Sequence, residues 1–278
     1  MATFLPEKKN NSKIYAAVAL MLILLGAVTI YFSLNLVLSN LNQTEPGGLA
    51  PVRVSHWAGY LVSLSIQNRS QGVSGISAAW TVPEVQFSEN NTYSSVWIGV
   101  GGYGEESLIQ AGTEQHCFNG KIEYFVWYEL LPAYIVRTQS VDVQPGDKVA
   151  FSINLLNQNQ STWQITIDNL SNGNHFEKTD IFYNSSQKSA EWIVERPMVE
   201  NVISKLANFG NVTLTNCTAT INGVNGSIKD FTYAPAIMVD STDNPLTSTS
   251  AFSGDGSSFS VNYLSPSLNA TLSPSTVP

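Results

Sequence analysis

The chain has 278 residues, of which 43% are hydrophobic and only 12% charged, and its net charge is −8 at pH 7. This length is enough for one sizeable core or two small ones, and charged residues are about half as frequent as the ~25% usual in soluble domains. Beyond residue 40 the sequence has 20 acidic and 10 basic residues. The acidic balance argues against a nucleic-acid partner, and the few charges predict a domain that tolerates acid.

The N-terminal segment is typical of a membrane anchor. Lys8, Lys9 and Lys13 precede an uncharged run over residues 14–38, which as a helix of ~1.5 Å per residue is long enough to cross a bilayer. No small-residue cleavage site follows the run, which favours an uncleaved signal-anchor over a removed signal peptide. Because the lysines come first, we expect residues 1–13 in the cytoplasm and the rest on the extracellular face of the membrane, or secreted if the segment is cleaved.

Two further features agree with an extracellular location. Ten Asn-x-Ser/Thr sequons follow residue 40, so the chain could be a glycoprotein, although a chain rich in Asn, Ser and Thr also generates sequons by chance. Cys117 and Cys217 could form one disulfide, which an oxidising environment favours. Buried unpaired cysteines are also common.

Residues 39–53 contain Pro and Gly and are typical of a short linker. Short β-prone runs separated by turn residues follow, at residues 60–66, 76–82, 94–100, 107–111, 122–131, 148–156, 162–167, 190–194, 211–221, 236–239 and 258–263. This spacing predicts an all-β antiparallel sandwich or barrel over residues 54–264. Residues 198–207 are expected to form a short helix or an irregular loop, and the Ser/Pro/Thr-rich residues 265–278 a disordered tail.

Several familiar hydrolase motifs are absent. The sequence has no Gly-x-Ser-x-Gly, no His-Glu-x-x-His and no Asp-Thr/Ser-Gly. His56, His116 and His175 are too scattered to suggest a metal cluster, and surface or core positions are expected for each. We therefore expect neither a metal ion nor another cofactor.

Carboxylates within apolar runs are the more informative signal. If residues 190–197 form a strand, Glu191 and Glu195 lie on one face and Trp192 and Val194 on the other. Carboxylates in apolar surroundings are costly to bury unless neighbouring groups use or satisfy them.

Three other residues stand in similar runs. Taken singly, Gln110 fits a buried hydrogen-bond anchor, Glu129 a satisfied ion pair, and Trp97 a core residue.

Six short motifs, taken in their order along the chain, resemble those of a known family. They are WAGY at 57–60, WTVP at 80–83, VWIG at 96–99, LIQAG at 108–112, WYELLPAY at 127–134 and AEWIVERP at 190–197. Together they resemble the glutamic peptidases, the eqolisin family of acid endopeptidases, and the similarity covers residues 54–263. The resemblance implies a sandwich of two antiparallel sheets similar to concanavalin A.

The resemblance also implies roles for particular residues. The catalytic glutamine falls on Gln110 and the catalytic glutamate on Glu195, with Glu191 as support, although these two acids could exchange roles. Five residues are expected to support the site or bind substrate: Trp97, Glu129, Glu191, Glu114 and Tyr128. The family acid four residues after Trp97 is Gly101 here, and Glu105 or Glu106 could take its place.

An amide and a carboxylate suit peptide hydrolysis in acid. The reaction needs an activated water, a donor for the oxyanion and a proton for the leaving amine. A histidine base would be protonated in acid, whereas a carboxylate stays ionised if hydrogen bonds hold its pKa near its free value of ~4.3. Glu195 is therefore expected to act as general base and then general acid, with Gln110 orienting the water and stabilising the oxyanion. The expected partner is a protein or peptide substrate, and the expected state a monomer.

Two alternatives remain. A carbohydrate-binding or glycoside-cleaving β-sandwich would use two acids and give Gln110 no role. An inactive cell-surface adhesion protein would agree with the anchor, the sequons and the missing acid at Gly101.

Overall fold

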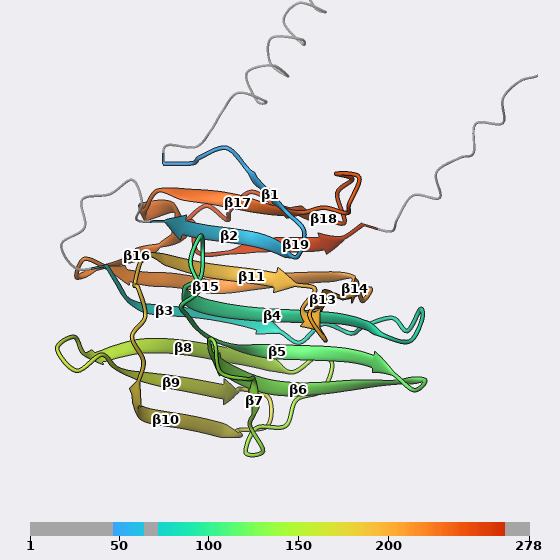
Figure 1. The fold of residues 1–278 in the computed structure, drawn as a ribbon, viewed down its shortest axis with the longest axis horizontal. Coiled ribbons are helices and arrows are strands. Elements are labelled where there is room, and N and C mark those ends of the chain that lie inside the picture. The colour runs from blue at the N-terminus through green and yellow to red at the C-terminus, as the bar shows by residue number, and fades with distance from the viewer. Residues whose placement is uncertain (1–46, 64–71, 265–278) are drawn as a thin grey trace, which may run out of the picture. The chain divides into compact units, whose positions relative to one another are not determined.

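The computed structural model describes residues 47–63 and 72–264, which form two packed β-sheets (Figure 1). The predicted signal-anchor over 14–38 and the predicted tail over 265–278 lie outside the described residues. Within the described ranges, no helix has the length and hydrophobicity required to cross a bilayer. The predicted all-β architecture with two packed sheets is confirmed.

Sheet A has nine strands in the order β1-β17-β2-β11-β4-β5-β6-β7, with β14 paired to β4. The strands are β1 (Val52–Val54), β2 (Trp57–Ser63), β4 (Thr92–Gly101), β5 (Leu108–Phe118), β6 (Lys121–Leu130), β7 (Val136–Arg137), β11 (Ser189–Glu195), β14 (Lys205–Leu206) and β17 (Tyr233–Met238). The pairs β1–β17 and β14–β4 are parallel, and the other pairs are antiparallel. Since β1 begins at Val52, the end of the predicted linker already belongs to the sheet.

Sheet B has eight strands in the order β10-β9-β8-β3-β15-β19-β18, with β16 paired to β15. The strands are β3 (Val73–Thr81), β8 (Lys148–Asn157), β9 (Thr162–Asn169), β10 (His175–Phe182), β15 (Asn211–Ile221), β16 (Val224–Ser227), β18 (Thr247–Thr249) and β19 (Phe259–Tyr263). A short 3-10 helix, η2 (Ile228–Asp230), follows β16. Where a helix or loop was expected, β12 (Met198–Val199) and β13 (Val202–Ile203) form a small hairpin.

The core lies between the two sheets, because alternate residues of each strand point into it. On β11, Trp192 and Val194 belong to this core and are fully buried, as the alternation predicts. The Trp192 indole N–H donates to the backbone oxygen of Ser77 across the sandwich at 2.9 Å. Burial of each such large side chain contributes about 1.5–3 kcal/mol. The face of β11 that carries Trp192 and Val194 therefore points into the core, and the other face points outward.

The two cysteines lie in different sheets, Cys117 on β5 and Cys217 on β15. Both are buried and both carry free thiols, so the disulfide considered from the sequence is not formed. Burial raises the pKa of the Cys217 thiol, which keeps it protonated and unreactive.

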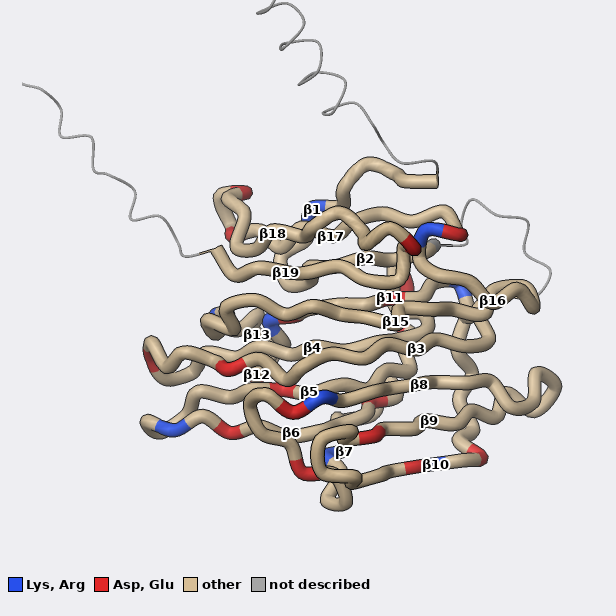
Figure 2. The backbone as a smooth tube through the Cα atoms, turned by 180° about the vertical axis from the view of Figure 1, so that it is seen from behind, with Lys and Arg blue, Asp and Glu red and all other residues tan. Residues whose placement is uncertain are grey.

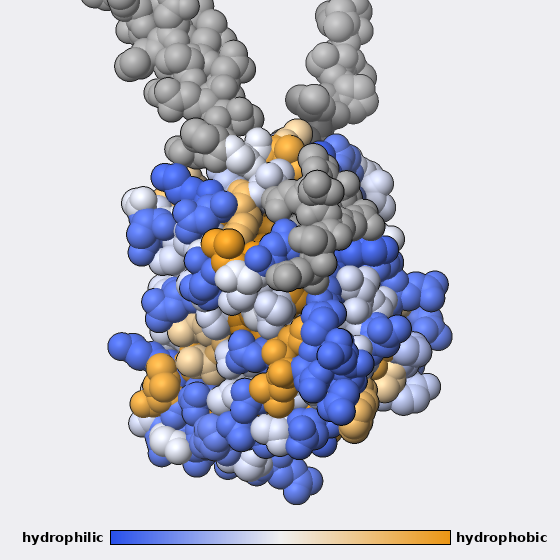
Figure 3. Space-filling model, turned by 90° about the vertical axis from the view of Figure 1, so that its left-hand side faces the viewer, coloured by the Kyte–Doolittle hydropathy of each residue, from blue (hydrophilic) through white to orange (hydrophobic). Residues whose placement is uncertain are grey.

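Charged side chains are absent from the two central strands of sheet B. Strands β3 and β15 contain no Lys, Arg, Asp or Glu, and Figure 2 shows the charges mainly at strand ends and in loops. On the face shown in Figure 3, hydrophobic residues form small patches among hydrophilic ones. Ser, Thr and Asn side chains do not titrate, so this surface changes little in charge in acid.

Candidate active site

The face of sheet A that points away from the core carries most of the predicted site residues. Four neighbouring strands, β11, β4, β5 and β6, form this face (Figure 1). Glu195 stands opposite Ser95, which stands opposite Glu114. Four residues from Glu114 along β5, on the same face, Gln110 stands opposite Glu129. Strand register therefore gathers residues that are up to about a hundred positions apart.

Tryptophans form the floor of this face. Trp97, Leu108, Trp127 and Ile193 make a second buried hydrophobic cluster, separate from the core. Gly112 makes room for it, because a Cβ there would lie 2.6 Å from the Trp97 Cβ. These rigid side chains hold the polar groups above them in place.

A groove with a volume of about 710 Å³ lies on this floor. Gln110 and Glu195 both line it, as do Glu114 and Glu129. Gln110 and Glu195, the expected catalytic residues, are 85 positions apart in the sequence and line the same groove.

Gln110 is held by Glu129. Its side-chain amide nitrogen donates to a Glu129 carboxylate oxygen at 2.6 Å, while its carbonyl oxygen is buried and has no partner within the described part of the chain. Burial raises the pKa of Glu129, an effect that the hydrogen bond from Gln110 partly offsets and the nearby Glu114 charge increases. The amide thus has one fixed contact and spare hydrogen-bonding capacity.

Glu195 accepts a hydrogen bond from the Trp97 indole at 2.7 Å. Burial nevertheless raises its pKa to about 8, since the Trp97 and Trp57 indoles offset only part of this effect and the charges of Glu114 and Glu129 add to it. The sequence-based expectation that hydrogen bonds hold this pKa near its free value is therefore wrong. The desolvation of the carboxylate outweighs the indole donors.

Glu191 occupies a different environment. It is fully buried, and neither carboxylate oxygen has a hydrogen-bond partner within the usual distance among the described residues. Burial raises its pKa well above the ordinary value, with Ser189 offsetting this in part and Glu105 adding to it. Glu191 does not line the groove, so the geometry favours Glu195 as the acid that meets a substrate.

Glu114 is paired with a histidine. The His116 Nε2 and a Glu114 oxygen lie 2.5 Å apart, and the His116 ring packs edge-on against Tyr93 and Phe125. The expectation of a surface or core position is met for His175, which pairs with exposed Asp168. His56 and His116, in contrast, line the groove.

Tyr128 does not join the site. It neighbours Glu129 on β6, so its side chain points to the opposite face, where it belongs to the core and stacks on Phe176. The placement of Tyr128 beside the site is therefore corrected by the alternation of the strand.

Gly101 cannot carry the family acid in this backbone. Its φ is +87°, and a Cβ there would lie 2.3 Å from the Ser107 backbone oxygen. Glu105 instead lies near Glu191 and 3.5 Å from Lys188. It is outside the groove.

The sequence analysis did not identify several other residues of the groove as site residues. Trp57, Phe125, Trp127 and Arg137 line the groove, and the Arg137 guanidinium lies 3.6 Å from the centre of the Phe125 ring. Phe125 and Trp127 alternate with buried residues on the strand that carries Glu129. A two-residue period counted back from Glu129 would have found them.

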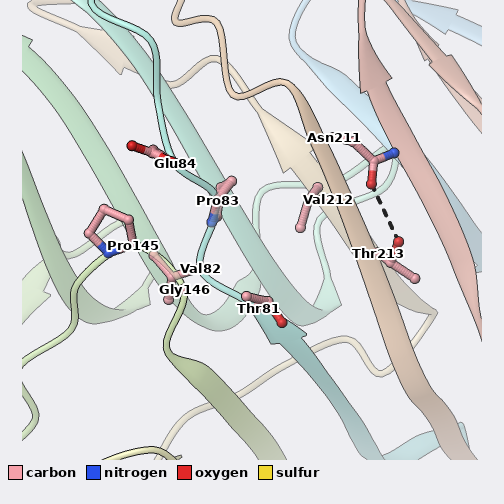
Figure 4. A pocket seen from close by; sticks show the side chains of 9 residues that line it. All are labelled: Thr81, Val82, Pro83, Glu84, Pro145, Gly146, Asn211, Val212 and Thr213. Carbon is pink, nitrogen blue, oxygen red and sulfur yellow. Dashed lines mark hydrogen bonds between the residues drawn. The ribbon is translucent and has the colours of Figure 1, made fainter.

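Another hollow, with a volume of about 520 Å³, lies elsewhere on the molecule (Figure 4). Glu84 is the only acidic residue among its nine lining residues, and none of the predicted site residues lines it. Within residues 47–63 and 72–264, no cluster of three or more His, Cys, Asp and Glu side chains is arranged to hold a metal ion.

Comparisons with known proteins agree with this geometry. Aspergillopepsin-2 of Aspergillus niger is 26% identical over 204 residues, which cover 72% of this chain and 70% of the relative. The crystal structure of scytalido-glutamic peptidase with a transition state analog inhibitor matches with a TM-score of 0.63 at 21% identity, over 76% of this chain and 98% of that one. Aspergilloglutamic peptidase from Aspergillus niger matches with a TM-score of 0.54 at 27% identity, over 62% of this chain and 99% of that one. The Peptidase A4 family model matches residues 55–263, and the chain therefore belongs to the Peptidase A4 family, the glutamic peptidases.

Proposed function

We propose that this protein is an acid endopeptidase that hydrolyses peptide bonds of proteins, with Glu195 and Gln110 as its catalytic residues. The observation that carries the proposal is that these two side chains line one groove together with Glu129, and that Trp97 donates a hydrogen bond to Glu195. The relatives named above are peptidases, and family membership supports the same reaction here. No step needs a metal or a covalent intermediate.

Glu195 exchanges protons with the attacking water and the departing amine. The reaction begins from the ionised carboxylate. The Trp97 indole stabilises the ionised form, which then takes a proton from water. Once the carboxylate has taken a proton from the attacking water, its raised pKa keeps that proton on the carboxyl in acid, which suits a donor to the leaving nitrogen.

Gln110 supplies the uncharged amide that works beside Glu195. Its carbonyl oxygen has no partner among the residues that the structure describes and can orient the water, while the amide N–H not used by Glu129 can donate to the developing oxyanion. An amide does not titrate, so this donor persists in strong acid. Removal of one such donor typically costs about 3–4 kcal/mol of barrier.

The test compares the wild-type chain with Gln110→Ala, Glu195→Gln and Glu191→Gln on a denatured protein in acid, with mass spectra of the products. We expect the first two variants to lose at least ~100-fold in kcat while keeping the circular dichroism of a folded sandwich. Wild-type turnover in either one refutes the assignment. Loss of activity in Glu191→Gln with full activity in Glu195→Gln would exchange the two roles, and release of reducing sugar from glycans without peptide cleavage would favour the carbohydrate alternative.

We also propose that residues 14–38 anchor the protein, with the sandwich on the extracellular face as a monomer. The support is the uncharged run and the lysines before it. Resistance of the full chain to extraction by alkaline carbonate, together with protease access to the sandwich from outside intact cells, is the expected result. Release of the full chain by carbonate would contradict the anchor.

A further inference from the structure

His116 lies in the groove, and the proposed reaction does not use it. It stands on β5 six residues beyond Gln110, so both side chains point to the same outer face of sheet A. Its neighbours across the strands are Tyr93 of β4 and Glu123 of β6, and these three strands lie side by side (Figure 1). The ring centres of Tyr93 and Phe125 lie 4.7 and 4.9 Å from that of His116. Two aromatic rings therefore fix the position of the imidazole.

The imidazole is paired with Glu114, which connects it to the proposed catalytic carboxyl. The His116 Nε2 lies 2.5 Å from a Glu114 oxygen, and only 7% of the Glu114 side chain is exposed. Glu195, Ser95 and Glu114 stand opposite one another on three neighbouring strands, so two strand spacings, about 9.6 Å, separate the backbones of the two acids. Beyond the effect of burial, the Glu114 charge raises the pKa of Glu195. A change in charge at Glu114 therefore reaches Glu195.

The imidazole offsets the Glu114 charge in acid. An imidazole is protonated there, and its Nε2–H then donates to a carboxylate. The resulting pair has no net charge. Without the imidazolium, the Glu114 carboxylate is uncompensated in a partly buried site, where charges are screened less than in water. It then disfavours a second negative charge on Glu195.

The groups that face the pair from β4 and β14 do not replace the imidazolium. Tyr93, opposite His116 on β4, is a phenol and carries no charge in acid. Lys205 of β14, the short strand that pairs with β4, is bound to Glu89 at 2.7 Å. Both side chains of that ion pair are more than half exposed, at 68% and 53%.

The groups on the β6 side and across the groove do not replace it either. Glu123, opposite His116 on β6, lies 3.8 Å from Arg137, and both are more than half exposed. Glu200 lines the groove as a further acid. His56 also lines it, but burial and the neighbouring Arg196 charge lower the pKa of His56.

We infer that His116 is a positioning residue of this site, whose imidazolium acts through Glu114 and favours the ionised form of Glu195 in acid. The consequence for catalysis rests on the proposed peptidase function. None of the six sequence motifs contains His116. The structural consequence is that activity extends to lower pH than Glu114 alone would permit.

The test is the pH profile of kcat/KM for the full-length chain on one peptide without titratable side chains. His116→Gln removes the charge and keeps a hydrogen-bonding group, and His116→Lys restores a positive charge. The double variant Glu114→Gln/His116→Gln removes both charges of the pair. His175→Gln is the matched control, because His175 pairs with the exposed Asp168 at 2.7 Å on the other sheet.

The acid limb of kcat/KM reports the base of the free enzyme. His116→Gln should move this limb to higher pH by about 0.5–1 pH unit, the effect of one charge about 12 Å away at an effective dielectric constant of about 20–40. At one pH on the limb this is a loss of about three- to tenfold. His116→Lys, the double variant and His175→Gln should keep the wild-type limb.

Three outcomes would overturn the inference. An unchanged limb in His116→Gln would mean that the imidazolium does not act on Glu195. An equal loss of kcat/KM at every pH would assign His116 a structural role only. A double variant that moves as far as His116→Gln would show that Glu114 does not transmit the effect.

The indole N–H signal of Trp97 in NMR spectra separates this inference from the proposed function. Trp97 donates to Glu195 at 2.7 Å, so its signal follows the ionisation of Glu195 whether or not peptides are cleaved. A midpoint that moves to higher pH in His116→Gln, in a chain that cleaves no peptide, supports the inference and refutes the peptidase. Cleavage with the same midpoint in both chains does the reverse.

Discussion

The burial of Glu191 contributes to the pH dependence of stability, in the same direction as the raised pKa values of Glu129 and Glu195. This side chain is fully buried and its pKa is raised well above the ordinary value of 4.5, so the folded chain keeps a proton that the unfolded chain releases. The contribution to stability is complete below pH 4.5 and is lost as the pH rises through the folded-state pKa. Each such group lowers the free energy of unfolding by up to about 1.4 kcal/mol per pH unit.

The perturbation is Glu191→Gln, which keeps the shape of a protonated carboxyl and does not titrate. Between pH 4.5 and the folded-state pKa of Glu191 it should remove a fall in unfolding free energy of up to about 1.4 kcal/mol per pH unit. Urea unfolding of the purified full-length chain at several pH values measures the slope. Glu106→Gln is the control, because Glu106 is exposed in a neighbouring loop, and it should leave the slope unchanged.

Equal slopes for wild type and Glu191→Gln would refute the reasoning, because the buried carboxyl would then release its proton equally in both states. A slope that falls equally in Glu106→Gln would also refute it. That result would assign the effect to overall charge.

Three other changes test separate contacts. Trp97→Phe removes the indole donor to Glu195, so the pKa of Glu195 should rise and the acid limb of kcat/KM should move to higher pH by about one unit; an unchanged limb would show that the bond does not stabilise the ionised form. Gly112→Ala places a Cβ 2.3 Å from the Val96 backbone oxygen, so chemical unfolding should show a loss of about 1–3 kcal/mol or more, and wild-type stability would contradict the packing described. A thiol reductant should leave the thermal midpoint unchanged, because Cys117 and Cys217 are free; a lowered midpoint would reveal a disulfide.

The local pattern of the sequence predicts a large part of this molecule. Alternation along residues 190–195 assigns Trp192 to the core and Glu195 to the outer face, and the structure confirms both. The same rule, applied to β6, would have placed Tyr128 and Glu129 on different faces of the sheet. That error came from proximity in sequence rather than from physics.

Other features depend on contacts that no local pattern contains. The pKa of Glu195 depends on how fully its neighbours remove water and on carboxylates from two other strands. The groove position of His116 depends on the register of β4, β5 and β6. The hairpin at 198–203 pairs residues with weak β patterns, and the free cysteines reflect strands assigned to different sheets.

The central claim is that Gln110 and Glu195 act together on one peptide bond. The most direct measurement is a double-mutant cycle of kcat in acid for Gln110→Ala, Glu195→Gln and the double variant on one peptide substrate. If they act as a unit, the double variant should lose about as much as either single one, each ~100-fold or more. Losses that multiply in the double variant would mean that the two side chains act independently and would contradict the account.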